Sequence, residues 1–586
     1  MVHRTVALTV AALALSGLII DGGQAQAALP NGYLITGAPT ALAPALQQAG
    51  QEESTAGEAD DALVPQSRLA WHVPDPQASR EEALKKLEEA VRDGERAAAA
   101  YGTRVIDRVD VIHRPEQLDL SLEDALRRAL DNSYAIETAA YSPAIETARV
   151  VEAEAVFDAL FYTNVIKNIQ DKPVGSDLAS SYVNYFDLRS GVRKLLPTGM
   201  QVGASYGVKR TYTSIVFQQI NPEYFSDITL EMRQPLLRGF GIDYNRSLIV
   251  IAKNNRLISD YAFRRQVRDT LRQVEEAYWR LVQARRDVVV TARLLAGFEA
   301  IYEYLEARRD FDVIPVQLAA TKANLESARW DFVRRCANVF DAEDQLTASM
   351  NAPDINLADA VEIIPLDFPS LSRIVVDPLA EVQVGLDHRP EIKEDELNVA
   401  NAKIAVGRAK NEELPKLDLT FRYMIDGLAG NADKAFDEVS RNKYSEYYVG
   451  VDLEVPIGNR GPRAATKRAK LQHDQAVSRL KLRFEEVILD VNMAVRELST
   501  TYEQIASSFE AAEAREREVE SIVARAERMD INTLTNELNA RQSLAAARRA
   551  MLAAVVDYNI AIIDLERAKG TLLRHYNVAV APNEGE

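Results

Sequence analysis

The chain has 586 residues and a net charge of −18, from 69 Lys and Arg against 87 Asp and Glu. This acidic excess argues against nucleic acid as a partner, because the phosphate backbone would repel it. A single Cys and six scattered His are too few and too dispersed to form a His/Cys metal centre or a disulfide framework. We therefore predict no metal site and no cofactor.

Residues 1–27 are predicted to be a signal peptide. Arg4 precedes the apolar run from Val6 to Ile20, and Ala25-Gln26-Ala27 has the small–x–small form of a cleavage site. Export combined with so little Cys is typical of a bacterial envelope protein. Residues 28–117 follow as an extension that we expect to be partly disordered, since Ala, Gly, Gln, Pro and acidic residues dominate its first part without periodicity.

A first structural repeat is predicted over residues 118–350. Its helical pattern opens at Leu118 with Ser121 as the N-cap and runs to about Phe157, with Pro143 as an expected kink or break.

Residues 158–240 are then predicted to form strands, because aromatic and β-branched residues alternate there with polar ones. Within this segment Leu196–Gly199 predicts a turn. Helical periodicity returns at Ile242, turns near Pro315 and ends near Met350.

The same general order of predicted helices and strands recurs in the second half of the chain. A connector over residues 351–388 leads to a second repeat, 389–573, and then to a tail, 574–586. The second repeat opens with a helix to about Glu413, followed by strand texture over 415–457.

The longest predicted element lies between Pro462 and Gly570, where 107 residues contain neither glycine nor proline. A single helix of this length would span about 160 Å, so we expect one fold-back, at Asp530–Thr533. The first arm, Arg463 to Asp530, would be a rod of about 100 Å. Its apolar residues alternate by three and four positions, as in a coiled coil: Val477, Leu480, Phe484, Val487, Val491, Ala494 and Leu498.

Sequence offsets support an internal duplication. Ile136 matches Ile392 at a shift of 256, whereas Pro235 matches Pro456 at a shift of 221. The first β segment therefore holds about 35 extra residues, which is room for one additional hairpin.

Weak period-two strands of this kind are typical of transmembrane β-barrels, which must close because every backbone polar group needs a partner in the bilayer. Four strands from one chain cannot close a pore, but several copies can. The sequence thus predicts an α+β membrane protein in which a shared β-barrel is continued by a coiled-coil α-helical barrel.

From about residue 118 to 573 the sequence resembles the TolC-type outer-membrane efflux protein family. Five segments carry the resemblance: Leu120-Ser121-Leu122-Glu123-Asp124-Ala125-Leu126, Gln234-Pro235-Leu236-Leu237-Arg238-Gly239-Phe240-Gly241, Ala277-Tyr278-Trp279-Arg280-Leu281-Val282, Arg389-Pro390-Glu391-Ile392 and Val455-Pro456-Ile457.

The resemblance implies a homotrimer in outer-membrane lipid, with a twelve-strand barrel on a twelve-helix periplasmic tunnel. That is about four strands per chain, possibly six if the extra residues near 170–210 form strands. It also implies a passive exit duct of a tripartite efflux or type I secretion system, joined by a periplasmic adaptor (membrane fusion) protein to an inner-membrane pump. Residues 28–117 would then be periplasmic.

The helical turns at about 308–315 and 526–534 would form the periplasmic tip. The resemblance implies an acidic constriction there, although solvated helix-end charges are the simpler explanation. Its candidates are Asp310, Asp312, Glu527 and Asp530, with Arg308, Arg309, Arg525 and Arg528 as residues that could pair with them.

Adaptor helices could dock beside the tip, although coiled-coil packing explains the leucines as well: Val316, Leu318, Thr533, Leu534 and Leu538. Aromatic residues of the strands could form girdles at the bilayer edges, or could simply reflect strand preference: Tyr206, Tyr212, Phe217, Tyr224, Phe225, Tyr444, Tyr447 and Tyr448.

No nucleophile–base set is evident, so we predict no enzymatic activity. The exported substrate stays open between small toxic molecules, metal cations and a secreted protein. The alternative function is a soluble periplasmic coiled-coil scaffold in which the β segments form a small cap.

Overall fold

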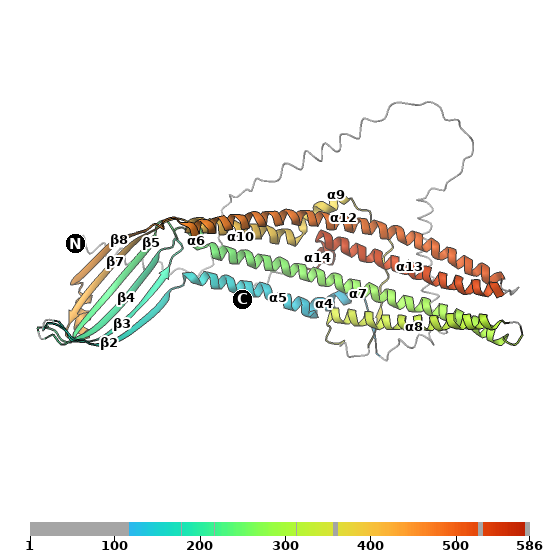
Figure 1. Ribbon diagram of the computed structural model, residues 1–586, viewed down its shortest axis with the longest axis horizontal. Coiled ribbons are helices and arrows are strands. Elements are labelled where there is room, and N and C mark those ends of the chain that lie inside the picture. The colour runs from blue at the N-terminus through green and yellow to red at the C-terminus, as the bar shows by residue number, and fades with distance from the viewer. Residues whose placement is uncertain are drawn as a thin grey trace, which may run out of the picture. The chain divides into compact units, whose positions relative to one another are not determined.

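The computed structural model describes residues 116–176, 179–215, 217–311, 313–355, 361–525 and 531–580. The predicted signal peptide and nearly all of the extension lie outside these ranges. The described residues belong to one compact unit, Pro74–Glu586. These described residues are mostly helical and form one large sheet and one small sheet (Figure 1).

One general pattern occurs twice along the described chain: a short strand, two helices, strands of the large sheet and two long helices. Residues 116–350 form β1 (Glu116–Leu120), α4 (Leu122–Asn132), α5 (Tyr134–Glu154), the 3-10 turn η1 (Ala155–Phe157), β2 (Leu160–Asp171), β3 (Tyr182–Leu195), β4 (Gln201–Thr213), β5 (Glu223–Pro235), α6 (Ile242–Asn245), α7 (Ser247–Ala307) and α8 (Pro315–Met350). The remainder forms β6 (Val361–Pro365), α9 (Pro378–His388), α10 (Pro390–Glu412), β7 (Lys416–Ala429), α11 (Ala432–Ser440), β8 (Tyr444–Glu454), α12 (Arg460–Arg525), α13 (Ile531–Lys569) and α14 (Leu572–His575).

The helices form a curved wall one layer thick. In the half of the wall next to the sheet, the helices pack side by side in the order α5, α7, α10, α12. In the half farther from the sheet the order is α8, α7, α13, α12 (Figure 1). Of the described helices, only α7 and α12 run through both halves, and α12 with 66 residues is about 100 Å long. The predicted seam is buried in this wall, since Val487, Val491 and Leu498 are each at most 2% exposed.

The fold-back predicted at Asp530–Thr533 lies a few residues too far along the chain. α12 ends at Arg525, and α13 already begins at Ile531, so Asn532 and Thr533 are helical rather than part of a turn. At its other end α12 starts at Arg460. Pro462 lies in the first turn, where a missing N–H breaks no helical hydrogen bond.

The large sheet has six antiparallel strands in the order β2-β3-β4-β5-β7-β8. The possible six strands per chain are therefore confirmed, and the primary expectation of about four is wrong. The additional pair is β3–β4, joined at the predicted Leu196–Gly199 turn, where Gly199 takes a φ of 91°. Its Cβ would lie 2.4 Å from the Gly239 carbonyl oxygen, so only glycine fits.

The two faces of this sheet differ in polarity. Side chains alternate between faces, so the strand register assigns each residue to one of them. One face is largely apolar: Phe161, Val165, Ile169, Phe186, Leu188, Val192, Val202, Ala204, Tyr206, Val208, Ile228, Leu230, Met232, Leu419, Phe421, Tyr423, Ile425, Tyr447, Val449, Val451 and Leu453. We call it the apolar face, and the opposite one the charged face.

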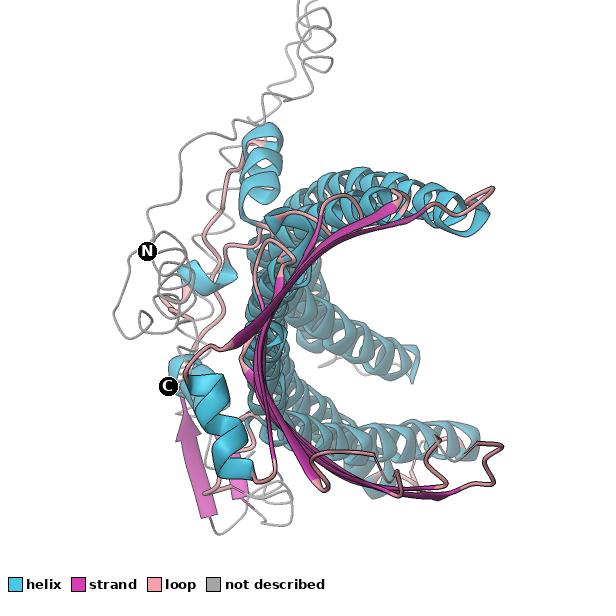
Figure 2. Ribbon diagram, turned by 90° about the vertical axis from the view of Figure 1, so that its left-hand side faces the viewer, coloured by secondary structure: helices cyan, strands magenta, loops and turns pink. Residues whose placement is uncertain are grey.

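The apolar face is the convex one. The unpredicted helix α11 lies on the convex side of the sheet (Figure 2), and Phe436 from this helix packs on Tyr206, with ring centroids 5.7 Å apart. At Gly427 a Cβ would lie 2.1 Å from the Ala435 carbonyl oxygen, so glycine is needed for this approach. Sheet and helical wall curve in the same sense and open on the same side (Figure 2).

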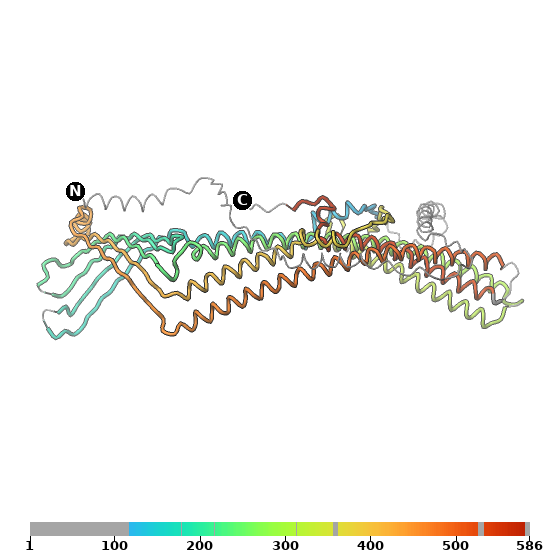
Figure 3. The backbone as a smooth tube through the Cα atoms, turned by 90° about the horizontal axis from the view of Figure 1, so that it is seen from above, coloured from blue at the N-terminus to red at the C-terminus, as the bar shows by residue number. Residues whose placement is uncertain are grey.

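A belt of small elements packs on the convex side of the helical wall (Figure 3). Residues 116–120, just before the predicted N-cap, form the unpredicted strand β1, which pairs in parallel with β6. Helix α4 starts at Leu122, and Ser121 is its N-cap as predicted, accepting a 3.1 Å hydrogen bond from the Asp124 amide. The helical break lies at Ser133 rather than Pro143, which is inside α5.

Candidate functional site

The charged face of the sheet is held together by ion pairs between strands. Arg189 on β3 reaches over Gly207 on β4 to Asp227 on β5, with 2.7 Å between Nη2 and Oδ1. A side chain at Gly207 would occupy this path, since its Cβ would lie 2.6 Å from the same Oδ1. The concave side of the sheet therefore presents a charged surface. The register also assigns the following residues to it: Asp187, Arg193, Lys209, Glu231, Arg233, Asp418, Arg422, Asp426, Glu446 and Asp452.

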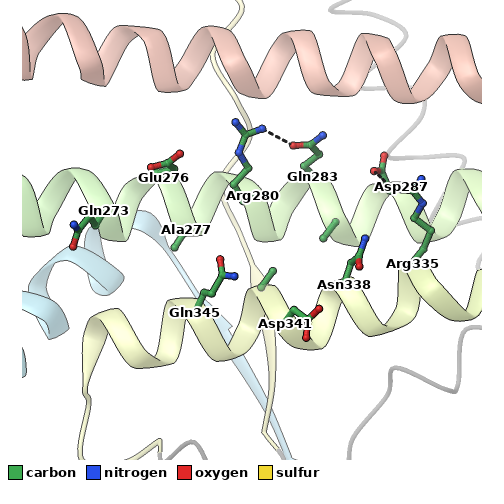
Figure 4. A pocket seen from close by; sticks show the side chains of 12 residues that line it. Gln273, Glu276, Ala277, Arg280, Gln283, Asp287, Arg335, Asn338, Asp341 and Gln345 are labelled. Carbon is green, nitrogen blue, oxygen red and sulfur yellow. Dashed lines mark hydrogen bonds and ion pairs between the residues drawn. The ribbon is translucent and has the colours of Figure 1, made fainter.

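The helical wall also carries polar hollows. One of about 660 Å³ lies between α7 and α8 (Figure 4). Arg280 in this hollow donates a 3.0 Å hydrogen bond to Gln283 and forms a 2.9 Å ion pair with Asp557 on α13. In the described part of the chain, no group of three or more His, Cys, Asp or Glu side chains could hold a metal ion. The hollow is lined mainly by amide and charged groups: Gln273, Glu276, Asp287, Arg335, Asn338, Asp341 and Gln345.

Both lateral edges of the wall expose apolar side chains. On α12 a second apolar row lies roughly opposite the buried seam, at 100° per residue: Leu471, Leu482, Leu489 and Met493. The other edge is α5 in one half and α8 in the other, and it also exposes large apolar groups: Tyr134, Tyr141, Ile145, Trp330 and Val333. Each edge is therefore an apolar surface that no other part of the described chain covers.

The tip lies where α7 turns into α8. Asp310 is exposed there, next to Phe311, which is 87% exposed. Arg309 forms a 3.5 Å ion pair with Glu306. Arg308 lies over the Tyr304 ring, 5.4 Å from its centroid. The structure therefore shows Arg308 and Arg309 engaged with their own helix.

The second half of the predicted tip is only partly described. Arg525 is exposed at the end of α12. The other candidates, Asp312, Glu527, Arg528 and Asp530, lie outside the described residues, so the acidic constriction and its arginine pairing stay predictions.

The predicted docking residues divide by exposure. Val316 is 75% exposed, whereas Leu538 is only 4% exposed and belongs to the core between the two hairpins. Leu318 and Leu534 are partly buried against that same core, and Thr533 is half-buried. For Leu538 the structure thus favours packing, the alternative explanation; a docking surface would have to centre on Val316.

The predicted aromatic girdle also divides, by sheet face. Tyr206, Tyr212, Tyr224 and Tyr447 fall on the apolar face, whereas Phe225, Tyr444 and Tyr448 fall on the charged face. The period of two turns these last three to the concave side, where the alternative explanation, strand preference, accounts for them. Phe217 lies between β4 and β5 and is 75% exposed.

The sequence did not reveal a buried ionic network, although two of its residues, Arg389 and Glu391, lie in the Arg389-Pro390-Glu391-Ile392 segment. Glu391 Oε1 lies 2.9 Å from Arg268 Nη2 on α7 and 3.2 Å from Arg389 Nη1. Arg389 also forms an ion pair with Asp490 on α12. Burial alone would raise the pKa of Glu391, but the two guanidinium groups outweigh it and hold that pKa below its ordinary value.

A second missed cluster surrounds Glu275, which is 5% exposed on α7. Tyr576, just after α14, donates its hydroxyl proton to this carboxylate, and Trp279 Nε1 donates at 3.3 Å. Burial raises the pKa of Glu275 to about 7, against the two donors, which lower it. Only the tertiary structure brings the chain end to α7.

Comparison with known proteins was made on sequence and on structure. Residues 382–571 match the sequence pattern of the family described as outer membrane efflux protein. No curated protein sequence matches the chain. Among its described helices, none has the length and hydropathy needed to cross a membrane.

Several solved structures share the fold. The outer-membrane channel OprN has a TM-score of 0.58 at 16% identity, over 77% of this chain and 90% of OprN. The CmeC outer membrane channel of Campylobacter jejuni gives 0.57 at 16%, over 77% and 86%. The outer membrane protein VceC of Vibrio cholerae gives 0.57 at 17%, over 77% and 96%. At these identities the likeness establishes the fold. The resemblance to the outer membrane efflux protein family is thus confirmed: this chain carries the sequence pattern of that family in residues 382–571 and has the fold of solved outer-membrane channels.

Proposed function

We propose that the protein is a passive outer-membrane channel of a tripartite efflux or type I secretion system. The observation that carries this proposal is the polarity of the curved sheet. Its convex face is apolar, its concave face is charged, and it continues into a helical wall curved in the same sense (Figure 2). An apolar exterior suits lipid and a charged interior suits water, which is the division that a membrane barrel needs.

The channel is assembled from three copies of the chain. One chain forms an open wall whose two edges expose apolar rows, on α12 and on α5 and α8. Burying one edge against the other of the next copy removes both rows from water and closes a ring. The sheet then lies in the outer membrane, and the helical barrel forms a periplasmic tunnel.

A soluble scaffold would not carry this sheet. Phe161, Tyr447 and Val451 are between 63% and 77% exposed on the apolar face, and such a face is unfavourable in water. Purified protein reconstituted in planar bilayers should give discrete conductance steps, and membrane extraction should require detergent. Recovery of a monomer in the soluble fraction, with no conductance after reconstitution, would instead support the scaffold.

The proposed trimer predicts a sensitive position on α12. Leu489→Asp places a carboxylate in each of three apolar contacts, and desolvating it opposes assembly. We expect the trimer fraction in detergent to fall about tenfold, because each of the three contacts is weakened. Mass photometry measures this fraction.

Gln472→Asp is the matched control. It adds the same charge to α12 at an exposed position about 100° away from the apolar row. Equal trimer fractions in both variants would show that the Leu489 row is not an interface.

The adaptor joins the channel to the inner-membrane pump at the end of the helical barrel that lies away from the sheet. Val316 and Phe311 are apolar groups exposed at the α7–α8 turn, where a helical partner would find a contact. No catalytic step is part of the proposed mechanism: the solute passes along the charged concave face, and energy comes from the pump.

The proposed acidic constriction makes Asp310 a testable gate residue. Three carboxylates facing one axis repel one another and attract cations. Asp310→Ala should raise the single-channel conductance, because the proposed gate holds the tip closed. Planar-bilayer recording measures this. Glu326→Ala, which removes an exposed acid of α8 away from the tip, is the control. Wild-type conductance in Asp310→Ala would dismiss this residue as a gate.

A further inference from the structure

The two edge strands of the sheet have free backbone groups. β2 pairs only with β3, and β8 pairs only with β7 in the described sheet. An unpaired edge cannot lie in a bilayer, because each unsatisfied N–H and C=O group is costly there. Within the proposed channel, these edges need partners from other copies of the chain.

The strand directions and faces permit pairing between β8 and β2. Six strands that alternate in direction leave β8 antiparallel to the β2 strand of the next copy. Residues on the apolar face of both edges are exposed, among them Phe161, Val165 and Ile169 on β2 and Val449 and Val451 on β8. Pairing in phase continues the apolar face without interruption, whereas a slip by one residue would turn these residues inward.

The width of six strands matches the width of the helical wall. Strands about 4.8 Å apart and tilted by about 40° occupy about 6.3 Å of circumference each, so six occupy about 38 Å. Four helices at interaxial distances of about 9–10 Å occupy about 36–40 Å. Figure 2 shows that sheet and wall extend over a similar arc.

We propose that three copies close an eighteen-stranded barrel, 3 × 6 strands, through β8–β2 pairing, rather than the twelve-stranded barrel expected from the sequence. This inference rests on the trimer of the proposed function. The barrel is as wide as the tunnel below it, about 36 Å across at the backbone. The extra hairpin β3–β4 is therefore part of the channel wall, and its charged residues Arg189, Arg193 and Lys209 line the bore.

Disulfide cross-linking of the full chain tests this closure. In a Cys336→Ala background, Val165→Cys on β2 is combined in turn with Tyr447→Cys, Val449→Cys and Val451→Cys on β8. Neighbouring antiparallel strands bring Cα atoms to about 4.5–5.5 Å, within disulfide range. We expect oxidation to convert most of the monomer band into covalent dimers and trimers for at least one pair, with reversal by reductant.

The matched control moves the first cysteine to β4, as Val208→Cys with the same β8 partners. Val208 lies on the same face but is separated from β8 by β5 and β7. Cross-links from β4 to β8 between chains would show a barrel that excludes β2 and β3, and would overturn the eighteen-strand closure. The closure is also overturned if no β2–β8 pair links two chains. The native mass of the unoxidised protein separates these results from failure of the trimer itself, since a monomer there would refute the proposed function.

Discussion

Replacing Glu391 by Ala should destabilise the helical wall more than any other single substitution that we consider. Glu391 compensates two guanidinium groups, and Arg268 and Arg389 are 3% and 5% exposed. Removal of the carboxylate leaves both cations buried without this acid. Breaking a buried ion pair by removing one partner costs about 3–5 kcal/mol. Urea unfolding of the detergent-solubilised protein, followed by helical circular dichroism, measures the loss.

Glu396→Ala provides the control on the same helix. Its ion pair with Lys393 is 3.0 Å long but both side chains are nearly half exposed, so we expect a loss below about 1 kcal/mol. A loss of the same small size for Glu391→Ala would show that water or another acid already compensates the two arginines.

The Glu391 effect has a defined pH dependence. Because the folded pKa of Glu391 lies below its ordinary value of 4.5, its stabilisation is present above that value and is lost as pH falls through the lower folded pKa. The difference in unfolding free energy between wild type and Glu391→Ala should therefore shrink in acid.

Replacing Glu275 by Gln should have the opposite sign at neutral pH. The folded pKa of about 7 exceeds the ordinary 4.5, so folding takes up a proton between these values. The stability associated with this group is complete below pH 4.5 and is lost as pH rises to about 7. At about 1.4 kcal/mol per pKa unit, the loss is about 3 kcal/mol.

The Glu275→Gln substitution should remove this loss while keeping the local contacts. The new side-chain carbonyl can accept from Trp279 Nε1, and its amide can donate to the Tyr576 hydroxyl oxygen. We expect the variant to be more stable than wild type at pH 8 by up to about 3 kcal/mol and to equal it near pH 4.5. Urea midpoints across this pH range measure both values.

Glu276→Gln is the control for the neighbouring position. Glu276 is about one-third exposed and pairs with Arg272 on the same helix. Its replacement should leave the pH dependence of wild type in place. If Glu275→Gln keeps that dependence too, the Tyr576 contact does not hold a titrating carboxylate, and the chain end is fixed to α7 by packing alone.

The candidate site could be predicted only where local patterns carry it. The spacing of Val487, Val491 and Leu498 identified the buried side of α12, because a helix repeats every 3.6 residues whatever lies beside it. The strand texture and the offset of about 35 residues indicated an extra hairpin without deciding whether it joins the sheet. Composition alone does not give the phase of a strand, so it could not divide the aromatic residues between the two faces of the sheet.

By itself, the sequence determined the lengths of the rods, the turns near Gly199 and Pro315, and the duplicated order of elements. These follow from local backbone preferences and from apolar periodicity, which act over a few residues. The tertiary structure alone decided that six strands share one sheet, that β1 pairs with β6, and that Arg268 meets Glu391. Such contacts join residues far apart in the chain, and their partners are selected by packing and charge compensation in space, which no local pattern encodes.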